Sequence, residues 1–205
     1  MSAAPKNPAL GVIILGAGAS VRMGKPKLLL PWADTTVIGQ IISIWRELGA
    51  GQITVVMRPN DVVLGVELDR LNVPQLNRIQ NPQPERGMFS SILCAAGWEG
   101  WRPEISSWAI VLGDQPHLQA KPLRQLLAFH TQNLDRICQP TTGGHAGHPV
   151  ILPPSAFEQL KTTRAATLKD FLKLMAASCV QCEINDPGLL LDLDTPEDYI
   201  RLQSR

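Results

Sequence analysis

The chain has 205 residues, of which 19 are lysine or arginine and 18 are aspartate or glutamate. This near-balance leaves no overall field to attract nucleic acid or a membrane surface, so any basic function must be local. The length suits one domain with a substantial core, and we expect a single domain over residues 1–205.

The N-terminal segment and the cysteines indicate a compartment. The first ten residues, MSAAPKNPAL, contain one lysine and no apolar stretch followed by a small-residue cleavage site, which argues against export. The four cysteines are spread over the chain rather than clustered, which favours reduced thiols over a disulfide framework. We therefore expect a soluble cytoplasmic protein with neither a membrane nor a nucleic-acid partner.

In the first half of the chain, apolar runs alternate with helical periodicity. The run Leu10–Leu15 is too short to span a membrane and has the length of a buried strand. Apolar residues from Val37 to Leu48 recur at helical spacing and end at Gly49. The pattern predicts strands at 10–15, 52–57 and 76–79, and helices at 36–48, 61–71 and 89–98.

In the second half, a buried strand at 108–112 precedes a helix at 122–130. Segments 137–139 and 150–152 flank a glycine-rich turn and are expected to pair as a hairpin. A helix at 169–177 and a strand at 179–184 follow. Thr195 and Pro196 then have the form of an N-cap and a first helical residue.

Alternating strands and helices predict an α/β fold with a mostly parallel sheet and helices on both faces. Ligands of such sheets bind at the carboxyl ends of the strands. Four unusual loops fall at that edge, and we expect them to converge there: residues 16–27, 86–91, 113–117 and 192–195.

The loop after the first strand reads LGAGASVRMGKPK and combines small residues with three cations. Gly16, Gly18 and Ser20 can expose backbone amides to phosphate. A Rossmann GxGxxG is excluded by Val21, and a Walker A loop does not fit the residues around Lys25. We expect Arg22 and Lys27 to contact phosphate. Lys25 precedes a proline, and solvation would explain it equally well.

Carboxylates follow two other segments of the same edge. Asp114, in the sequence VLGDQP, comes directly after a buried strand, where it could cap a helix or bind Mg²⁺. Asp192 and Asp194 alternate along an extended segment, so only one of them can face the site directly. We expect Asp194 to be the second metal ligand. Asp192 could act through water or hold a cation.

The segment Arg86–Ser91, reading RGMFSS, is a weaker signal. A glycine before a helix with two hydroxyls in its first turn suits an anion or the polar edge of a base, although an ordinary helix start would look the same. No Ser-His-Asp or Cys-His nucleophile can be assembled from the sequence.

Taken together, these motifs resemble the molybdenum cofactor cytidylyltransferases and their relatives in the nucleotidyltransferase superfamily. The first loop, with its continuation LLLPW, is similar to the family's LAAGxSxRMGxPKLLLP signature. The other matching motifs follow in order along almost the full chain: GMFSS at 87–91, GDQP at 113–116, GHPV at 147–150 and DLDTPEDY at 192–199.

The resemblance implies a Rossmann-like fold of the nucleotide-diphospho-sugar transferase type. It also implies Mg²⁺-dependent transfer of CMP from CTP to the terminal phosphate of molybdopterin, with release of pyrophosphate. The catalytic residues would be Arg22, Lys27 and Asp114, and the metal ligands Asp114 and Asp194. The acceptor would face Gly147, His148 and Pro149. The nucleotide would contact Leu15, Gly16, Ala17, Gly18, Ser20, Arg22, Lys27, Gly87, Met88, Ser90 and Ser91.

One departure concerns the choice of base. The family usually has alanine where this chain has Gly16, and Ala17 stands where the guanylyl branch typically has glycine. GTP therefore remains an alternative to CTP. A molybdopterin guanylyltransferase, a sugar-1-phosphate nucleotidyltransferase, and a non-catalytic chaperone that passes cofactor to a molybdoenzyme are the competing functions. A client molybdoenzyme would be a further partner.

Overall fold

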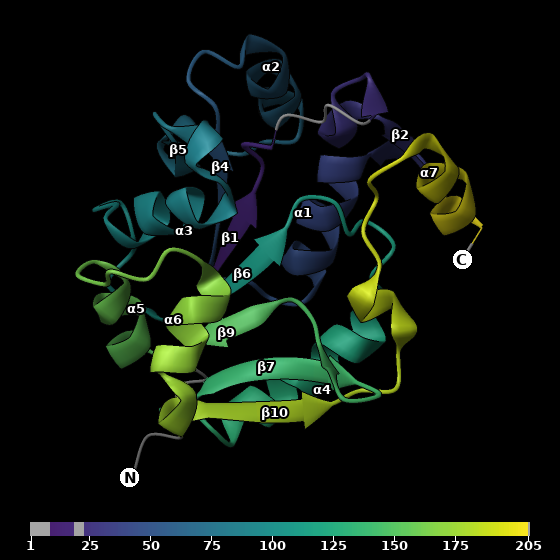
Figure 1. Ribbon diagram of the computed structural model, residues 1–205. Helices are drawn as coiled ribbons and strands as arrows, with labels where there is room; N and C mark the ends of the chain where they lie inside the picture. The colour runs from purple at the N-terminus through teal and green to yellow at the C-terminus, as the bar shows by residue number, and fades with distance from the viewer. Residues whose placement is uncertain (1–8, 19–22, 205) are drawn as a thin grey trace, which may run out of the picture.

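A mixed β-sheet forms the centre of the protein. The computed structural model describes residues 9–18 and 23–204 (Figure 1). Its main sheet has the strand order β10-β7-β9-β6-β1-β4-β5, and β8 pairs with β7. The strands of this sheet are β1 (Ala9–Leu15), β4 (Gln52–Met57), β5 (Arg78–Gln80), β6 (Ile105–Leu112), β7 (Ile137–Thr142), β8 (His145–Ala146), β9 (Val150–Leu152) and β10 (Cys179–Glu183). A separate two-stranded ribbon pairs β2 (Pro31–Trp32) with β3 (Thr35–Thr36).

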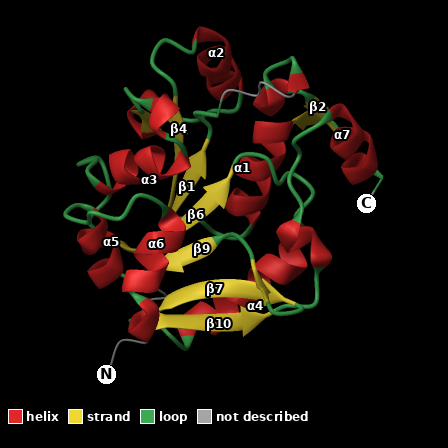
Figure 2. Cartoon of the chain, in the orientation of Figure 1, coloured by secondary structure: helices red, strands yellow, loops and turns green. Residues whose placement is uncertain are grey.

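Helices cover both faces of the sheet (Figure 2). They are α1 (Val37–Glu47), α2 (Val62–Arg70), α3 (Met88–Ala96), α4 (Ala120–Thr131), α5 (Pro154–Leu160), α6 (Leu168–Leu174) and α7 (Pro196–Gln203). Side chains of α1, α2, α4 and α7 pack into one hydrophobic cluster, and those of α3, α5 and α6 pack into another. Along β1, Val12 and Ile14 enter the first cluster and Ile13 the second, because successive strand residues point to opposite faces.

The strand directions confirm the predicted mostly parallel, mixed sheet. β1 runs parallel to both β4 and β6, β4 to β5, and β7 to β10. Only the pairings of β8 and β9 within this sheet are antiparallel. The parallel strands β1, β4 and β6 are neighbours, so the loops that leave their carboxyl ends meet at one edge.

Three details differ from the sequence-based expectation. The helix α5 was not predicted; it begins at Pro154, and proline is compatible with the first turn of a helix. The strand expected at 76–79 is instead a 3-10 turn at Gln75–Asn77 followed by β5. Segments 137–139 and 150–152 do pair, but the tight hairpin joins β7 to β8, and β9 lies between β7 and β6.

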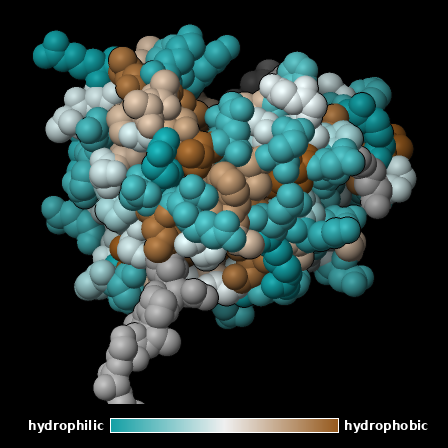
Figure 3. Space-filling view, turned by 90° about the horizontal axis from the view of Figure 1, so that it is seen from below, coloured by the Kyte–Doolittle hydropathy of each residue, from teal (hydrophilic) through white to brown (hydrophobic). Residues whose placement is uncertain are grey.

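Hydrophobic residues on the face seen in Figure 3 are scattered among hydrophilic ones, which is ordinary for a protein surface. Among the residues that the structure describes, no helix is both long enough and apolar enough to cross a membrane.

Candidate active site

Three of the four loops predicted to converge, 16–27, 86–91 and 113–117, contribute residues to one cavity of about 600 Å³. The fourth, 192–195, does not line this cavity and reaches the same edge through hydrogen bonds to Asp114 and Lys27. Its walls come from the end of β1, the segment that leads into α3, and the end of β6. Of the predicted nucleotide-binding residues, this cavity is lined by Leu15, Ala17, Gly18, Gly87, Met88 and Ser91, together with Asp114.

Two glycines allow the strand ends to approach this closely. A Cβ atom on Gly113 would lie 2.5 Å from the carbonyl oxygen of Leu15, a distance that side chains do not tolerate. At Gly16 the amide donates a hydrogen bond to the Val56 carbonyl at 2.8 Å, and a Cβ there would lie 3.0 Å from the same oxygen. The missing side chains therefore bring β1, β4 and β6 together just where their loops begin.

Lys27 joins the two predicted metal ligands. It begins the 3-10 turn Lys27–Leu29, and its Nζ donates to Asp114 Oδ2 at 3.0 Å and to Asp194 Oδ1 at 3.1 Å. The Leu193 amide donates to the Asp114 carbonyl at 2.9 Å, which fixes the segment that carries Asp194. Residues from three distant parts of the chain thus form one charged junction.

Asp192 lies close to the same junction. Burial raises the pKa of its carboxyl group, and the charges of Asp114 and Asp194 raise it further. Its Oδ1 accepts a hydrogen bond from the Gln115 carboxamide at 3.1 Å, which opposes the rise. Asp194 contacts Lys27 directly, and Asp192, which is the more exposed of the two, adds negative charge beside the junction.

The carboxylates of this junction suit a hard divalent cation. Asp114 Oδ1 is buried and has no hydrogen-bond partner among the described residues, an arrangement that ordinarily costs free energy. Within residues 9–18 and 23–204, no three histidine, cysteine or acidic side chains are grouped as a complete metal site. Mg²⁺ usually takes one or two carboxylates and completes its shell with water and substrate phosphate, so the donor set fits that ion.

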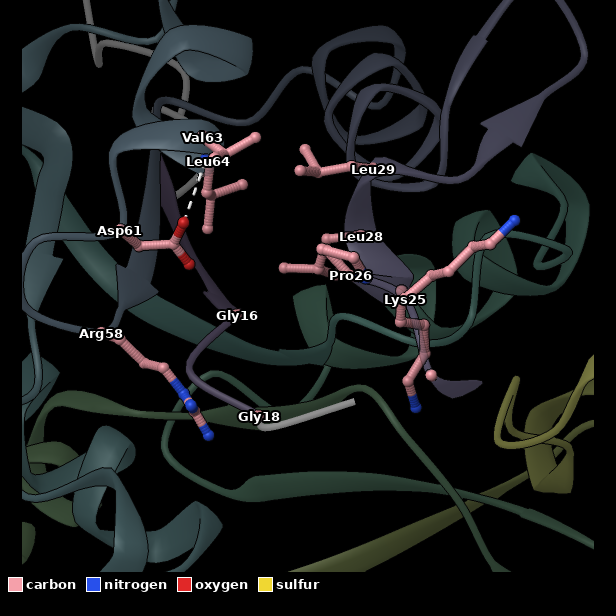
Figure 4. Close-up of a pocket in the computed structure, with 12 residues that line it drawn as sticks. Gly16, Gly18, Lys25, Pro26, Leu28, Leu29, Arg58, Asp61, Val63 and Leu64 are labelled. Carbon is pink, nitrogen blue, oxygen red and sulfur yellow. Dashed lines mark hydrogen bonds between the residues drawn. The ribbon is translucent and has the colours of Figure 1, made fainter. Parts of the chain in front are cut away.

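A smaller cavity of about 430 Å³ lies between the end of β1, the segment 24–29 and the start of α2 (Figure 4). Gly16 and Lys25 line it. Gly18 and Arg58 line both this cavity and the larger one. The predicted phosphate contacts Ser20 and Arg22 lie outside the described residues.

Arg58 is a candidate that sequence reasoning missed. Its Nε donates to the Ala17 carbonyl at 2.9 Å, and its guanidinium group points toward Gly18 in Figure 4. The available signal was its position directly after β4, the strand next to β1. A cation there lies at the same edge of the sheet as the phosphate-type loop.

Asn81 organises the start of α3. Its Nδ2 donates to Ser90 Oγ at 2.8 Å and to Ser91 Oγ at 2.9 Å. The Ser90 hydroxyl donates to the Gly87 carbonyl at 2.7 Å, and Gly87 has a φ of 86°. The hydroxyl of Ser90 is therefore used within the turn, whereas Ser91 lines the cavity.

The predicted acceptor residues differ in accessibility. Gly147 is buried, and a Cβ on it would lie 2.7 Å from the Leu189 carbonyl oxygen. Pro149 is also buried. His148 lines a third cavity together with Met88. Burial lowers the pKa of its imidazole, against the opposing effects of a hydrogen bond to the Ile110 backbone and of the Asp114 charge. The lowered pKa favours the uncharged form of His148.

Residues 12–180 match the model of the MobA-like NTP transferase domain. The chain belongs to this family. It is 25% identical over 201 residues to the molybdenum cofactor cytidylyltransferase of Escherichia coli strain K12, covering 96% of this chain and 97% of that protein. It is also 33% identical to the bifunctional protein GlmU of Clavibacter sepedonicus over 131 residues, which are 62% of this chain and 26% of GlmU.

Solved structures share the fold of this chain. Rv0371c of Mycobacterium tuberculosis H37Rv aligns over 98% of this chain and 100% of its own, at 26% identity and a TM-score of 0.75. A nucleotidyl transferase of Methanothermobacter, Mth528, shares the fold with a TM-score of 0.76 at 18% identity over 96% of each chain. The protein is a nucleotidyltransferase of the predicted fold class.

Proposed function

We propose that the protein transfers CMP from CTP to the terminal phosphate of molybdopterin and releases pyrophosphate, with Mg²⁺ as the metal. The observation that carries this proposal is the junction of Lys27 with Asp114 and Asp194 beside the loop at 15–18. The full-length similarity to a molybdenum cofactor cytidylyltransferase supports the choice of nucleotide and acceptor.

The proposed reaction needs no activated protein nucleophile. A phosphate monoester has a second pKa near ~6, so it is already a dianion for much of the time at neutral pH. An oxygen of this phosphate attacks the α-phosphorus of the nucleotide, and the bond from that phosphorus to the oxygen bridging to the β-phosphate breaks. The enzyme must therefore bring two anions together, align them, and stabilise the leaving pyrophosphate.

The described residues can meet these demands. Asp114 and Asp194 would hold Mg²⁺, which supplies charge neutralisation for the phosphates when bound. Lys27 places a second positive charge at the same point, and Arg58 adds one beside Gly18. Ser20 and Arg22 remain predicted phosphate contacts.

Recognition of the base is assigned to the wall formed by Ala17 and Gly18 and to the start of α3 from Gly87 to Ser91. Ala17 is 6% exposed and lines the 600 Å³ cavity. Its methyl group narrows the space there and favours a pyrimidine over the larger purine.

The test is to incubate the protein with molybdopterin, Mg²⁺ and each of the four NTPs in turn. Pyrophosphate release and the mass of the nucleotide attached to the pterin are measured. CMP attachment that depends on CTP supports the proposal. Attachment of GMP identifies a guanylyltransferase instead, and nucleotide binding without pyrophosphate release in any arm identifies a chaperone. A parallel reaction replaces molybdopterin with a sugar 1-phosphate. A nucleotide sugar formed in that reaction would identify the protein as a sugar-1-phosphate nucleotidyltransferase.

A further inference from the structure

A cavity of about 870 Å³ adjoins the nucleotide cavity, and Met88 lines both of them. One wall is α6, which packs through Leu168 and Phe171 into the same hydrophobic cluster as β7. The other walls come from β7, β10 and His148. The two cavities therefore meet at Met88, and the elements that line the larger one, α6, β7 and β10, lie beside one another in Figure 1.

The charge of this cavity is entirely positive. Lys169 and Lys173 line it, and no aspartate or glutamate does. Lys169 forms no ion pair with any residue in the described part of the chain, and Lys173 Nζ lies 3.8 Å from Asp170 Oδ1 with both side chains well exposed. Two lysines at i and i+4 repel each other on a helix. A ligand with negative charge would relieve this repulsion.

The strands supply hydrogen-bonding groups at the same place. Gln139 of β7 and Gln181 of β10 are register partners in the parallel pair, so their side chains lie next to each other on one face. Neither carboxamide hydrogen-bonds to another described residue. Each offers both donors and an acceptor. With Met88 and Leu172 as apolar walls, the cavity suits a flat, hydrogen-bonding heterocycle.

We propose that this cavity binds the body of the acceptor, with the two carboxamides on its ring edge and Lys169 and Lys173 on an anionic group other than the reacting phosphate. The reacting phosphate belongs in the cavity that contains Asp114, and neither lysine lines that cavity. The lysines must therefore meet a different negative group. The inference rests on the proposed function and adds to it the residues that select a second anionic group on the acceptor.

The test compares the double variant Lys169→Ala/Lys173→Ala with the wild type and with Lys161→Ala. Lys161 is an exposed lysine that pairs with Glu158 at the end of α5 and does not line the cavity. Equilibrium dialysis with molybdopterin in the absence of nucleotide gives a Kd that does not depend on activity, and steady-state kinetics give KM for each substrate.

We expect the double variant to raise both Kd and KM for molybdopterin at least tenfold, while KM for CTP stays within twofold. Lys161→Ala should match the wild type, and Lys169→Arg/Lys173→Arg should retain most of the affinity. A double variant with unchanged Kd for molybdopterin overturns the assignment of the cavity while leaving the proposed function intact.

The same experiment also distinguishes a failure of the proposed function from a failure of the cavity assignment. A wild type that binds molybdopterin but transfers no nucleotide to it overturns the proposed function, and the dialysis of the double variant still decides the cavity. A wild type that does not bind molybdopterin overturns both.

Discussion

The two cavities that meet at Met88 are built from different parts of the fold. The nucleotide side consists of loops that leave β1, β4 and β6, with backbone groups, Arg58 and a cluster of carboxylates. The acceptor side consists of side chains on α6, β7 and β10, with two lysines and no acid.

This difference has a physical basis. All nucleotides carry the same phosphate groups. Backbone amides and a metal ion can bind these groups, so a specific protein side chain is not required. An acceptor of unusual shape needs side chains held on rigid elements. We therefore expect substitutions on the nucleotide side to change the chemical step, and those beside α6 to change acceptor affinity.

The largest expected effect is that of Lys27→Ala. Removing a preorganised charge beside the transferring phosphate is expected to lower kcat/KM by about 10²- to 10³-fold, or roughly 3–4 kcal/mol. The measurement is steady-state kinetics, with circular dichroism to check the fold and the exposed Lys121→Ala on α4 as the control. A loss of less than about tenfold would show that Lys27 has another role.

The metal ligands should give the next largest effect. Asp114→Asn and Asp194→Asn keep the shape of the side chain and remove charge from a hard-cation site. We expect the Mg²⁺ concentration for half-maximal rate to rise at least tenfold, about 1.4 kcal/mol, for Asp114→Asn. The rise should be smaller for Asp194→Asn, because Asp114 follows the core strand β6 directly. Full activity of Asp114→Asn at unchanged Mg²⁺ would contradict the metal assignment.

The third prediction concerns the preference for CTP over GTP, which we assign to the cavity wall at Ala17. Fit in a pocket is worth about 1–3 kcal/mol, so the wild type should prefer CTP over GTP by roughly 10- to 200-fold in kcat/KM. Ala17→Gly removes the methyl group from the cavity wall and should shift that preference toward GTP, leaving KM for molybdopterin unchanged. Equal values for CTP and GTP in the wild type would instead place this chain outside the cytidylyl branch.

The smallest expected effect concerns stability. Burial and neighbouring acids raise the pKa of Asp192, so folding disfavours its charged form. The resulting destabilisation is absent well below the ordinary pKa and develops as the pH rises through the raised value. Asp192→Asn should therefore raise Tm at pH 7 without Mg²⁺ by a few degrees at most, since the side chain is exposed and solvent screens its charge.

The same measurement with Mg²⁺ completes the test. The wild type should gain more Tm from added Mg²⁺ than Asp192→Asn does, because the ion is attracted by the charge that the variant lacks. If Tm of the variant is lower than that of the wild type at pH 7 without the ion, Asp192 stabilises the fold rather than serving the site.

Most of the fold could be predicted from the sequence because its signals are local. The apolar run of β1, the β-branched run of β4 and the capping residues Thr36 and Thr195 each act over a few neighbours. The alternation of these elements was enough to predict the parallel sheet and the edge at which its loops meet. The helix α5 was not predicted: it has only seven residues and begins with a proline, a residue found both at helix starts and in turns.

The residues of the site also fall into two groups, those that the sequence indicates and those that only the tertiary structure identifies. The motifs alone indicated Lys27, Asp114 and Asp194, since glycines, cations and acids cluster visibly along the chain. Which of them touch was decided by the tertiary structure, because the contacts of Lys27 join residues 87 and 167 positions apart. Arg58 and the lysines and carboxamides that line the cavity beside α6 lie outside every motif, and their positions depend on how β4, β7 and β10 are ordered in the sheet. The residue types in each motif can be identified from the sequence, whereas contacts between residues far apart in the chain depend on how the whole chain packs.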